Sequence, residues 1–360
     1  MKTLVIEREA VKNNIGVIKE RAGEAVIYAV LTGDGQGAGL VELARLLREE
    51  GIGRFAVSEP AEAAALRRAG FVEEEILMLR PTVDRAELEQ LIDLNVVCTV
   101  GSADTGMALN GAAEARSTVV EAHIQIDTGM GFGGFLADEP EKILSVYRNL
   151  PNVAVSGICT QLHARKKGGE DLAARLGQFH RVVEAIRAAG FETGVVHAAG
   201  SYALLHCADA RLDGVRAGSA LLGRCRRVHG DGLYRVGYGE VGIEETRWLP
   251  KGHTVGSARP VVLRRPTRVA VLPVGYADGL HRVLSNQGSV WLAGKTRPIL
   301  GRVCMDMCMV ALDEDAQVEP GDEAEIFGSH LPAEVQAELA GTIQYELLCA
   351  VSPRVPRVYV

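Results

Sequence analysis

The sequence predicts an α/β protein in which a (β/α)8 TIM-type barrel is followed by a mostly β C-terminal domain. Short β-branched runs alternate with amphipathic segments from about residue 25 to residue 222, as in parallel sheets covered by helices. After about Gly230 the runs follow one another through Gly and Asp turns. The chain has 360 residues, more than one ordinary core holds, so we expect two domains, residues 1–229 and residues 230–360.

The first domain contains eight candidate strands, each short and bounded by Gly, Pro or Asp. Eight strands alternating with helices favour a closed barrel, whose chemistry lies at the C-terminal ends of the strands. A doubly wound open sheet stays the alternative, because periodicity does not separate the two. The candidate strands are residues 25–31, 54–57, 76–79, 96–100, 119–126, 155–160, 195–197 and, less clearly, 214–216.

Segments whose apolar residues recur at helical spacing connect these strands. Residues 40–47 show it clearly, and residues 60–69 begin at Pro60 and end before Gly70, as helices often do. The second domain, from about Tyr234, shows only one clear helix, and the first few residues of the chain are a candidate extra strand for it. Its helix is expected near residues 332–340 and its clearest strands at residues 268–274, 289–292 and 324–327.

Composition excludes several classes of partner. The chain has 39 Lys and Arg against 46 Asp and Glu, a net charge of −7, so nucleic acid and anionic membranes are poor partners. We interpret its one basic cluster, residues 224–227, as a solvated turn. Seven cysteines without a CxxC motif favour a reduced, cytoplasmic protein. The N-terminus becomes charged too soon for us to expect a signal peptide, and the sequence has no apolar stretch of about 18 residues.

Seven short segments, taken in order, resemble the alanine racemase family, the fold-type III pyridoxal phosphate (PLP) enzymes. The resemblance covers nearly the whole chain and implies a barrel plus β domain, paired head-to-tail as a homodimer. The segments are Ala29-Val30-Leu31, Asp127-Thr128-Gly129-Met130-Gly131, His197-Ala198-Ala199-Gly200-Ser201, Val215-Arg216-Ala217-Gly218, Val274-Gly275-Tyr276-Ala277-Asp278-Gly279, Gly301-Arg302-Val303-Cys304-Met305-Asp306, and Tyr345-Glu346 with Arg354-Val355-Pro356-Arg357.

The chain departs from the family pattern at the residues that carry the chemistry. The family's first barrel strand ends in a lysine that forms a Schiff base with PLP, and Thr32 stands at that position. Gln36 replaces the tyrosine that holds the cofactor phosphate, and Ser257 replaces the tyrosine that acts as the second base. Gln125 and Phe132 replace a lysine and the arginine that recognises the substrate carboxylate. We therefore expect no catalytic residue and no covalently bound PLP.

Other family positions are kept, so the resemblance implies a remaining site for PLP held noncovalently or for another phosphorylated ligand. Ser201 and the amides of Gly218 and Ser219, expected at a helix N-terminus, match the phosphate site. Arg216 matches the arginine that faces the pyridine nitrogen. His197 and Tyr345 belong to the same cofactor-binding set, and Met305 matches a residue of the substrate entrance.

Three hypotheses stay open. The first is a pseudoenzyme that binds a small anionic ligand. A Schiff base on Lys166 or Lys167, in the loop after a barrel strand, would contradict it. The second is a divergent amino-acid isomerase or other enzyme with noncovalent PLP or a metal, using His163, His197 or Asp127. The third is a structural dimer in which Gln36 and Phe132 fill the pocket.

Overall fold

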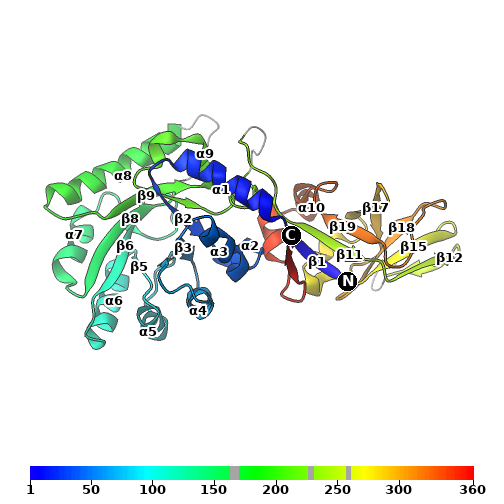
Figure 1. Cartoon of the computed structure of the whole chain (residues 1–360), viewed down its shortest axis with the longest axis horizontal. Helices are drawn as coiled ribbons and strands as arrows, with labels where there is room; N and C mark the ends of the chain where they lie inside the picture. Colours follow the sequence, from blue (N-terminus) through cyan, green and yellow to red (C-terminus); the bar gives the residue numbers. More distant parts are fainter. Residues whose placement is uncertain (163–169, 226–230, 257–260) are drawn as a thin grey trace. The chain divides into compact units, whose positions relative to one another are not determined.

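A computed structural model describes residues 1–162, 170–225, 231–256 and 261–360. The chain divides into two compact units (Figure 1). The barrel unit holds Val11–Gly35 and Leu40–Tyr234. The β-rich unit takes two short segments from the N-terminal part of the sequence together with the C-terminal part: Met1–Ala10, Gln36–Gly39 and Arg235–Val360.

The barrel unit is built on eight parallel strands in the order β4-β3-β2-β10-β9-β8-β6-β5. A parallel bridge between Leu77 and Val97 joins the two end strands, β4 and β5. This confirms the TIM-type barrel and excludes the open-sheet alternative. The strands are β2 (Val26–Val30), β3 (Arg54–Val57), β4 (Glu75–Met78), β5 (Cys98–Val100), β6 (Val120–Asp127), β8 (Val153–Thr160), β9 (Val195–Gly200) and β10 (Gly214–Ala217); the short β7 (Phe135–Leu136) pairs with β6.

Apolar spacing explains the helices that follow the strands. In α3 (Leu40–Glu49), Leu40, Leu43 and Leu47 lie on one buried stripe, as a helix covering a sheet requires. In α4 (Pro60–Arg68), the Glu62 side chain accepts from the backbone N–H of Glu59, so the first turn is capped. The other helices of this unit are α1 (Arg8–Ala22), which begins in the β-rich unit, α5 (Arg85–Asp93), α6 (Ala103–Ala115), α7 (Pro140–Asn149), α8 (Glu170–Ala188) and α9 (Ser201–His206), with a 3-10 turn η1 (Ala208–Ala210).

The β-rich unit is formed by a nine-stranded sheet in the order β12-β15-β18-β17-β16-β19-β11-β1-β20. β1 (Lys2–Ile6) pairs antiparallel with β11 (Tyr238–Gly242) and parallel with β20 (Arg357–Tyr359). The remaining strands are β12 (Glu245–Leu249), β15 (Thr267–Leu272), β16 (Ser289–Leu292), β17 (Lys295–Leu300), β18 (Cys308–Leu312) and β19 (Glu323–Phe327), with a separate pair β13 (Thr254–Val255) and β14 (Val261–Val262).

The helices of the β-rich unit differ from the expectation of a single helix. The expected one is present as α10 (Ala333–Ala340), but a second, α11 (Gln344–Cys349), follows it after Gly341. Six residues are too few to show a helical period, so the pattern could not reveal α11. Two 3-10 turns, η2 (Tyr276–Asp278) and η3 (Arg282–Leu284), complete the unit.

Burial corrects the interpretation of the basic cluster at residues 224–227. The prediction of a solvated turn is wrong for Arg224, which is 2% exposed, while residues 226 and 227 lie outside the described residues.

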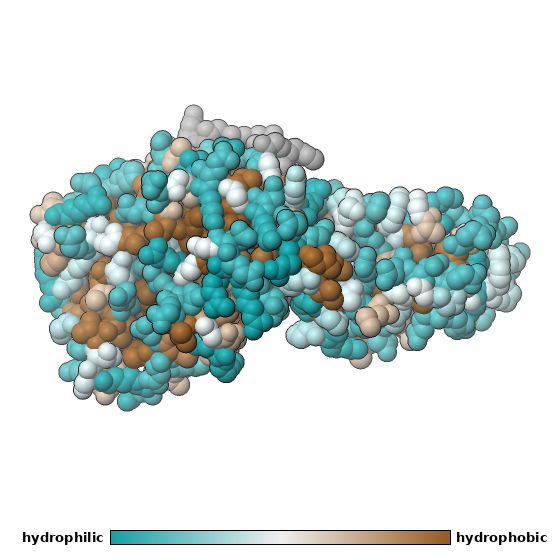
Figure 2. All heavy atoms as spheres, in the orientation of Figure 1, coloured by the Kyte–Doolittle hydropathy of each residue, from teal (hydrophilic) through white to brown (hydrophobic). Residues whose placement is uncertain are grey.

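All seven cysteines are free thiols. No helix in the described residues combines the length and apolar composition needed to span a bilayer. Figure 2 shows hydrophilic side chains over most of the visible face of both units, with apolar patches on the barrel unit.

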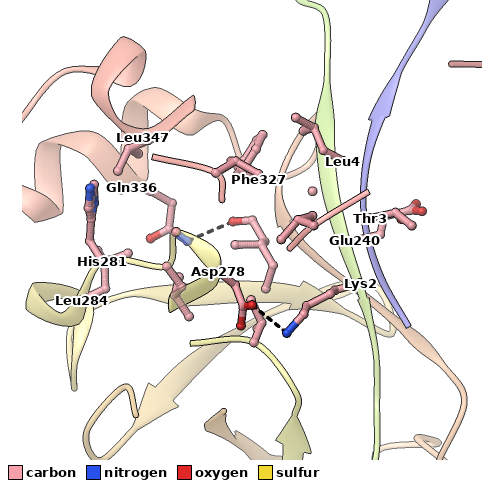
Figure 3. A pocket seen from close by; sticks show the side chains of 17 residues that line it. Lys2, Thr3, Leu4, Glu240, Asp278, His281, Leu284, Phe327, Gln336 and Leu347 are labelled. Carbon is pink, nitrogen blue, oxygen red and sulfur yellow. Dashed lines mark hydrogen bonds and ion pairs between the residues drawn. The ribbon is translucent and has the colours of Figure 1, made fainter. Parts of the chain in front are cut away.

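A buried ion pair stabilises the β-rich unit. The Asp278 side chain is fully buried, and its Oδ1 lies 2.8 Å from Lys2 Nζ (Figure 3). Its Oδ2 accepts from the backbone N–H of Gly275 at 3.0 Å. The contact therefore ties β1 to the turn that follows β15.

Replacing this carboxylate by a neutral amide should destabilise the protein. We expect Asp278→Asn to lower the free energy of unfolding by about 3 kcal/mol, because Lys2 then faces a buried site without its counter-charge. Urea denaturation measures the change. Asp315→Asn, at an exposed position, is the control and should change stability by less than about 0.5 kcal/mol. Equal denaturation midpoints for Asp278→Asn and wild type would contradict the expectation.

Candidate functional site

The barrel unit brings the predicted residues of its strands to one edge. Thr32 follows β2, Ser201 follows β9, Arg216 lies in β10, and Gly218 comes directly after that strand. We call the C-terminal strand ends and the loops after them the barrel mouth. In barrels of this type that edge carries the functional groups. The candidate site is therefore the barrel mouth.

Arg216 is the buried cation of the barrel mouth. It is 7% exposed, and its Nη2 donates to the carbonyl of Thr160 at 2.6 Å and to Gln161 Oε1 at 2.9 Å. Its Nη1 lies 2.7 Å from His197 Nδ1. Burial lowers the pKa of the guanidinium, which stays protonated at neutral pH. These three acceptors are neutral, so they hold the cation without cancelling its charge.

Arg216 also determines the tautomers of two buried histidines. A guanidinium only donates hydrogen bonds, so His197 Nδ1 must be unprotonated and the proton must sit on Nε2. His197 Nε2 lies 2.8 Å from His123 Nδ1, which therefore accepts. The hydrogen bonds thus run in one direction, from Arg216 to His197 and from His197 to His123.

Burial keeps both imidazoles neutral. It lowers the pKa of His123 from its ordinary value of 6.5 to about 4. Burial first, then the nearby Arg216 charge, lowers the pKa of His197 well below its usual range. Neither histidine is in a position to act as an acid or base at neutral pH, which removes support for His197 in the second hypothesis.

Tyr28 packs beneath the two histidines. Its ring stacks on His197 at 5.3 Å between centroids, and its hydroxyl donates to Glu75 Oε1 at 2.8 Å. Burial, then Glu75, raises the pKa of Tyr28, so the hydroxyl stays protonated. Sequence reasoning did not identify Tyr28 or His123. The available signal was alternation along β6, which places His123 on the same side as Gln125.

Ser201 forms a cradle with the turn after β10. Its Oγ accepts from the backbone N–H groups of Gly218 at 3.0 Å and Ala220 at 3.1 Å. The expectation that Gly218 and Ser219 begin a helix is wrong: residues 219–223 form successive turns, because Leu221 donates back to Gly218 at 2.9 Å. Both amides donate to Ser201 Oγ, so the hydroxyl is held in place and its own O–H is left to donate to another acceptor.

The loop that begins at Thr32 is a left-handed turn. Gly33, Asp34 and Gly35 have φ values of 68°, 56° and 63°, a conformation that L-residues rarely adopt. Glu62 Oε1 accepts from the N–H groups of Gly33 at 2.7 Å and Asp34 at 3.3 Å. Glu62, which sequence reasoning missed, therefore holds the backbone directly after Thr32.

No described lysine of the barrel unit lies at the barrel mouth. Lys12 and Lys19 belong to α1, where Lys19 Nζ donates to the carbonyl of Glu50, and Lys142 belongs to α7. None of these three follows a barrel strand. The predicted substitutes, Lys166 and Lys167, lie outside the described residues.

Strand β6 holds Gln125, and the loop after it holds Phe132, the two other positions that differ from the family pattern. Gln125 Nε2 donates to the carbonyl of Gly133 at 3.3 Å, and Phe132 is 73% exposed. Phe132 therefore does not fill the pocket, contrary to the third hypothesis. Both oxygens of Asp127 accept from backbone N–H groups, those of Gly129, Met130 and Gly131 at 2.7–3.0 Å. Asp127 shapes this loop and is not free to act as a base.

The remaining predicted residues belong to the β-rich unit or lie outside the described residues. Gln36 lies in the β-rich unit, where Arg357 Nε donates to the neighbouring Gly37 carbonyl at 3.0 Å. Tyr345 lies in α11 of the same unit. Ser257 and His163 are outside the described residues. Among the residues that the structure describes, no three His, Cys, Asp or Glu side chains gather as metal ligands.

The β-rich unit contains a small apolar cavity, shown in Figure 3. Its volume is about 50 Å³, and Leu4, Leu284, Phe327 and Leu347 contribute to its lining. One water molecule occupies about 30 Å³ of liquid. The cavity therefore holds one or two waters at most and is not a ligand site.

The neutral histidines predict an acid-sensitive fold. Burial depresses the pKa of His123 in the folded state, so between pH 6.5 and about pH 4 the unfolded state binds a proton on His123 that the folded state does not. The free energy of unfolding therefore falls by roughly 3 kcal/mol as the pH is lowered across this range. Urea denaturation at pH 7 and pH 4.5 measures the loss. His123→Gln, whose amide stays neutral, should lose less, and the exposed His180→Gln should behave as wild type. Equal acid losses in His123→Gln and wild type would show that His123 is not responsible.

Comparisons with known proteins agree over the full length. The model of the alanine racemase N-terminal domain matches residues 6–225, and that of the C-terminal domain matches residues 240–359. The chain is 36% identical to an alanine racemase of Carboxydothermus hydrogenoformans, covering 99% of this chain and 98% of that one. An alanine racemase of Desulfovibrio desulfuricans is 34% identical, covering 99% and 97%.

Solved structures show the same relationship. An alanine racemase of Clostridium difficile 630 matches with a TM-score of 0.93 at 29% identity, covering 100% of this chain and 95% of that one. The alanine racemase of Streptomyces lavendulae matches with a TM-score of 0.91 at 28% identity, covering 100% and 97%. The chain belongs to the alanine racemase family.

Proposed function

We propose that this member of the family does not racemise alanine and instead binds a small phosphorylated ligand noncovalently at the barrel mouth. The observation that carries the proposal is Thr32, which follows the first barrel strand, β2, and has a hydroxyl where the family pattern has an amine. A hydroxyl cannot condense with an aldehyde to form a Schiff base. The absence of a lysine after any barrel strand in the described ranges supports it.

A related structure illustrates what is missing. The alanine racemase of Bartonella henselae, 26% identical with a TM-score of 0.90, is described with covalently bound pyridoxal phosphate. A covalent link of this kind needs a primary amine at the cofactor aldehyde. By the family resemblance, Ser257 also lacks the acidity that a second base requires at neutral pH. The described residues of the barrel mouth therefore do not fit a covalently attached cofactor.

The same residues fit a noncovalent anion. The backbone N–H groups of Gly218 and Ala220 both donate to Ser201 Oγ, so the Ser201 O–H is the group left to donate to a phosphate oxygen. Arg216 adds a buried positive charge whose described acceptors are neutral. Pyridoxal phosphate, if bound, would supply an electron-withdrawing ring facing Arg216. Any ligand of this class would be held by this chain through charge and hydrogen bonds alone.

Borohydride trapping tests the proposal directly. After incubation with pyridoxal phosphate and reduction, we expect no pyridoxyl-lysine at the barrel mouth by peptide mass mapping, and no racemisation of L-alanine in a coupled assay. Thr32→Lys is the matched positive control, because it restores an amine at the strand end and should become labelled at residue 32. Both preparations should bind the cofactor reversibly before reduction.

Two results would overturn the loss of activity. One is trapping on Lys166 or Lys167 in the wild-type protein. The other is racemisation that disappears when Ser201 or Arg216 is replaced. Failure to bind pyridoxal phosphate or inorganic phosphate at millimolar concentration would instead reject the ligand-binding part of the proposal.

We also propose that two copies of the chain form a homodimer. Tyr276, Met305 and Met307 are 44%, 57% and 38% exposed, and they lie on adjoining loops, since Tyr276 N donates to the carbonyl of Cys304 and Cys304 N donates to that of Met307. Exposed apolar groups that gather in this way mark interaction surfaces. The family resemblance favours a second copy of the chain as the partner.

Sedimentation velocity tests the dimer. We expect wild type to sediment with twice the mass of one chain, and Met305→Asp to shift the population toward single chains by placing a charge in the interface. Asp315→Asn should not change the distribution. A wild-type protein that stays a single chain at micromolar concentration would disprove the dimer.

A further inference from the structure

Three buried polar atoms of the β-rich unit gather at one cavity without a hydrogen-bond partner among the described residues. They are Gln336 Oε1, His281 Nδ1 and Asp278 Oδ1, and their residues line the cavity shown in Figure 3. Gln336 and Asp278 are only 2% and 3% exposed. Native folds rarely leave such atoms unpaired, so their concentration at one cavity indicates a bound partner there.

The Gln336 side chain is held with its oxygen unpaired. Its amide nitrogen, Nε2, donates to the carbonyl of Ser289 in β16 and to that of Ile326 in β19, the latter at 3.2 Å. An amide turned the other way would bring its oxygen against these two carbonyl oxygens, so the hydrogen bonds assign the nitrogen to this side. Oε1 therefore needs a donor from the cavity.

Asp278 has one oxygen satisfied and one available. Oδ2 accepts from the backbone N–H of Gly275 at 3.0 Å. Oδ1 lies 2.8 Å from Lys2 Nζ, but this ammonium directs its hydrogen bond to the carbonyl of Pro273 at 3.0 Å, so its contact with Oδ1 is an ion pair alone. His281 Nδ1 donates or accepts according to its tautomer. The cavity thus offers two acceptors and one group of either kind.

Size and charge restrict what this cavity can bind. Its volume of about 50 Å³ admits one or two waters, since each occupies about 30 Å³ in the liquid. The charge of Lys2 opposes a cation, and that of Asp278 opposes an anion. The rest of the lining is largely apolar and includes Leu284, Phe327 and Leu347. A neutral molecule of the size of water, which both donates and accepts, meets these conditions.

We propose that the cavity is a binding site for ordered water, with one or two molecules hydrogen-bonded to Gln336 Oε1, His281 Nδ1 and Asp278 Oδ1. Three polar partners lie within the range of about two to four that a buried water needs. Gln336 belongs to α10, Asp278 belongs to η2, and His281 directly precedes η3. The water therefore joins a helix to two turns of the β-rich unit. This inference does not depend on the proposed function.

Crystals under xenon pressure test the site directly. A dry apolar cavity takes up xenon, whereas a cavity filled by hydrogen-bonded water does not. In high-resolution crystals of the full chain, we expect water density within hydrogen-bond reach of Gln336 Oε1 and no xenon peak after pressurisation. A xenon peak in the cavity, or the absence of water density at all three polar atoms, would overturn the proposal.

Magnetic relaxation dispersion of the water oxygen counts long-lived buried waters in solution. Leu284→Phe adds volume at the cavity wall, so we expect it to remove one or two of these waters relative to wild type. Leu339→Phe, the same change at an exposed position of α10, is the control and should keep the wild-type count. If Leu284→Phe does not fold by circular dichroism, Gln336→Met takes its place, because it removes one polar partner. An unchanged count in the folded cavity variant would contradict the assignment.

Discussion

The arrangement of the barrel mouth depends on one buried cation, Arg216. Because a guanidinium only donates, its contact with His197 determines which nitrogen of that ring carries the proton, and His197 in turn determines the tautomer of His123. Burial keeps both rings neutral, so the positive charge is not shared with them. A barrel interior can hold such a charge only when every acceptor is well placed. The network is therefore rigid, and it faces any ligand as a single positive group.

Carboxylates shape the loops around this cation without neutralising it. Glu62 holds the left-handed turn after Thr32, and Asp127 holds the loop after β6, each by accepting backbone N–H groups. Their carboxylate oxygens accept backbone N–H groups, so these charges are not paired with Arg216. Arg216 therefore remains a buried positive charge with neutral acceptors at the barrel mouth.

Sequence reasoning reached the fold closely and the site only in part. All eight barrel strands were predicted near their observed positions, because burial on both faces leaves short β-branched runs that are easy to find. Arg224 was predicted to lie at the surface and is buried, because a cluster of charged residues in the sequence does not indicate which side chain packs into the core. Phe132 was expected to be able to fill the pocket and is exposed.

The sequence by itself determined the barrel, the β-rich C-terminal part and the presence of a hydroxyl-bearing residue, Thr32, just after the first barrel strand, because these follow from periodicity and from residue identity. Only the tertiary structure decided which polar groups meet. The contact of Arg216 with His197 and the cradle at Ser201 join residues that are far apart in the sequence. Closing the barrel brings their strand ends to one edge, and spacing along the chain carries no information about that distance.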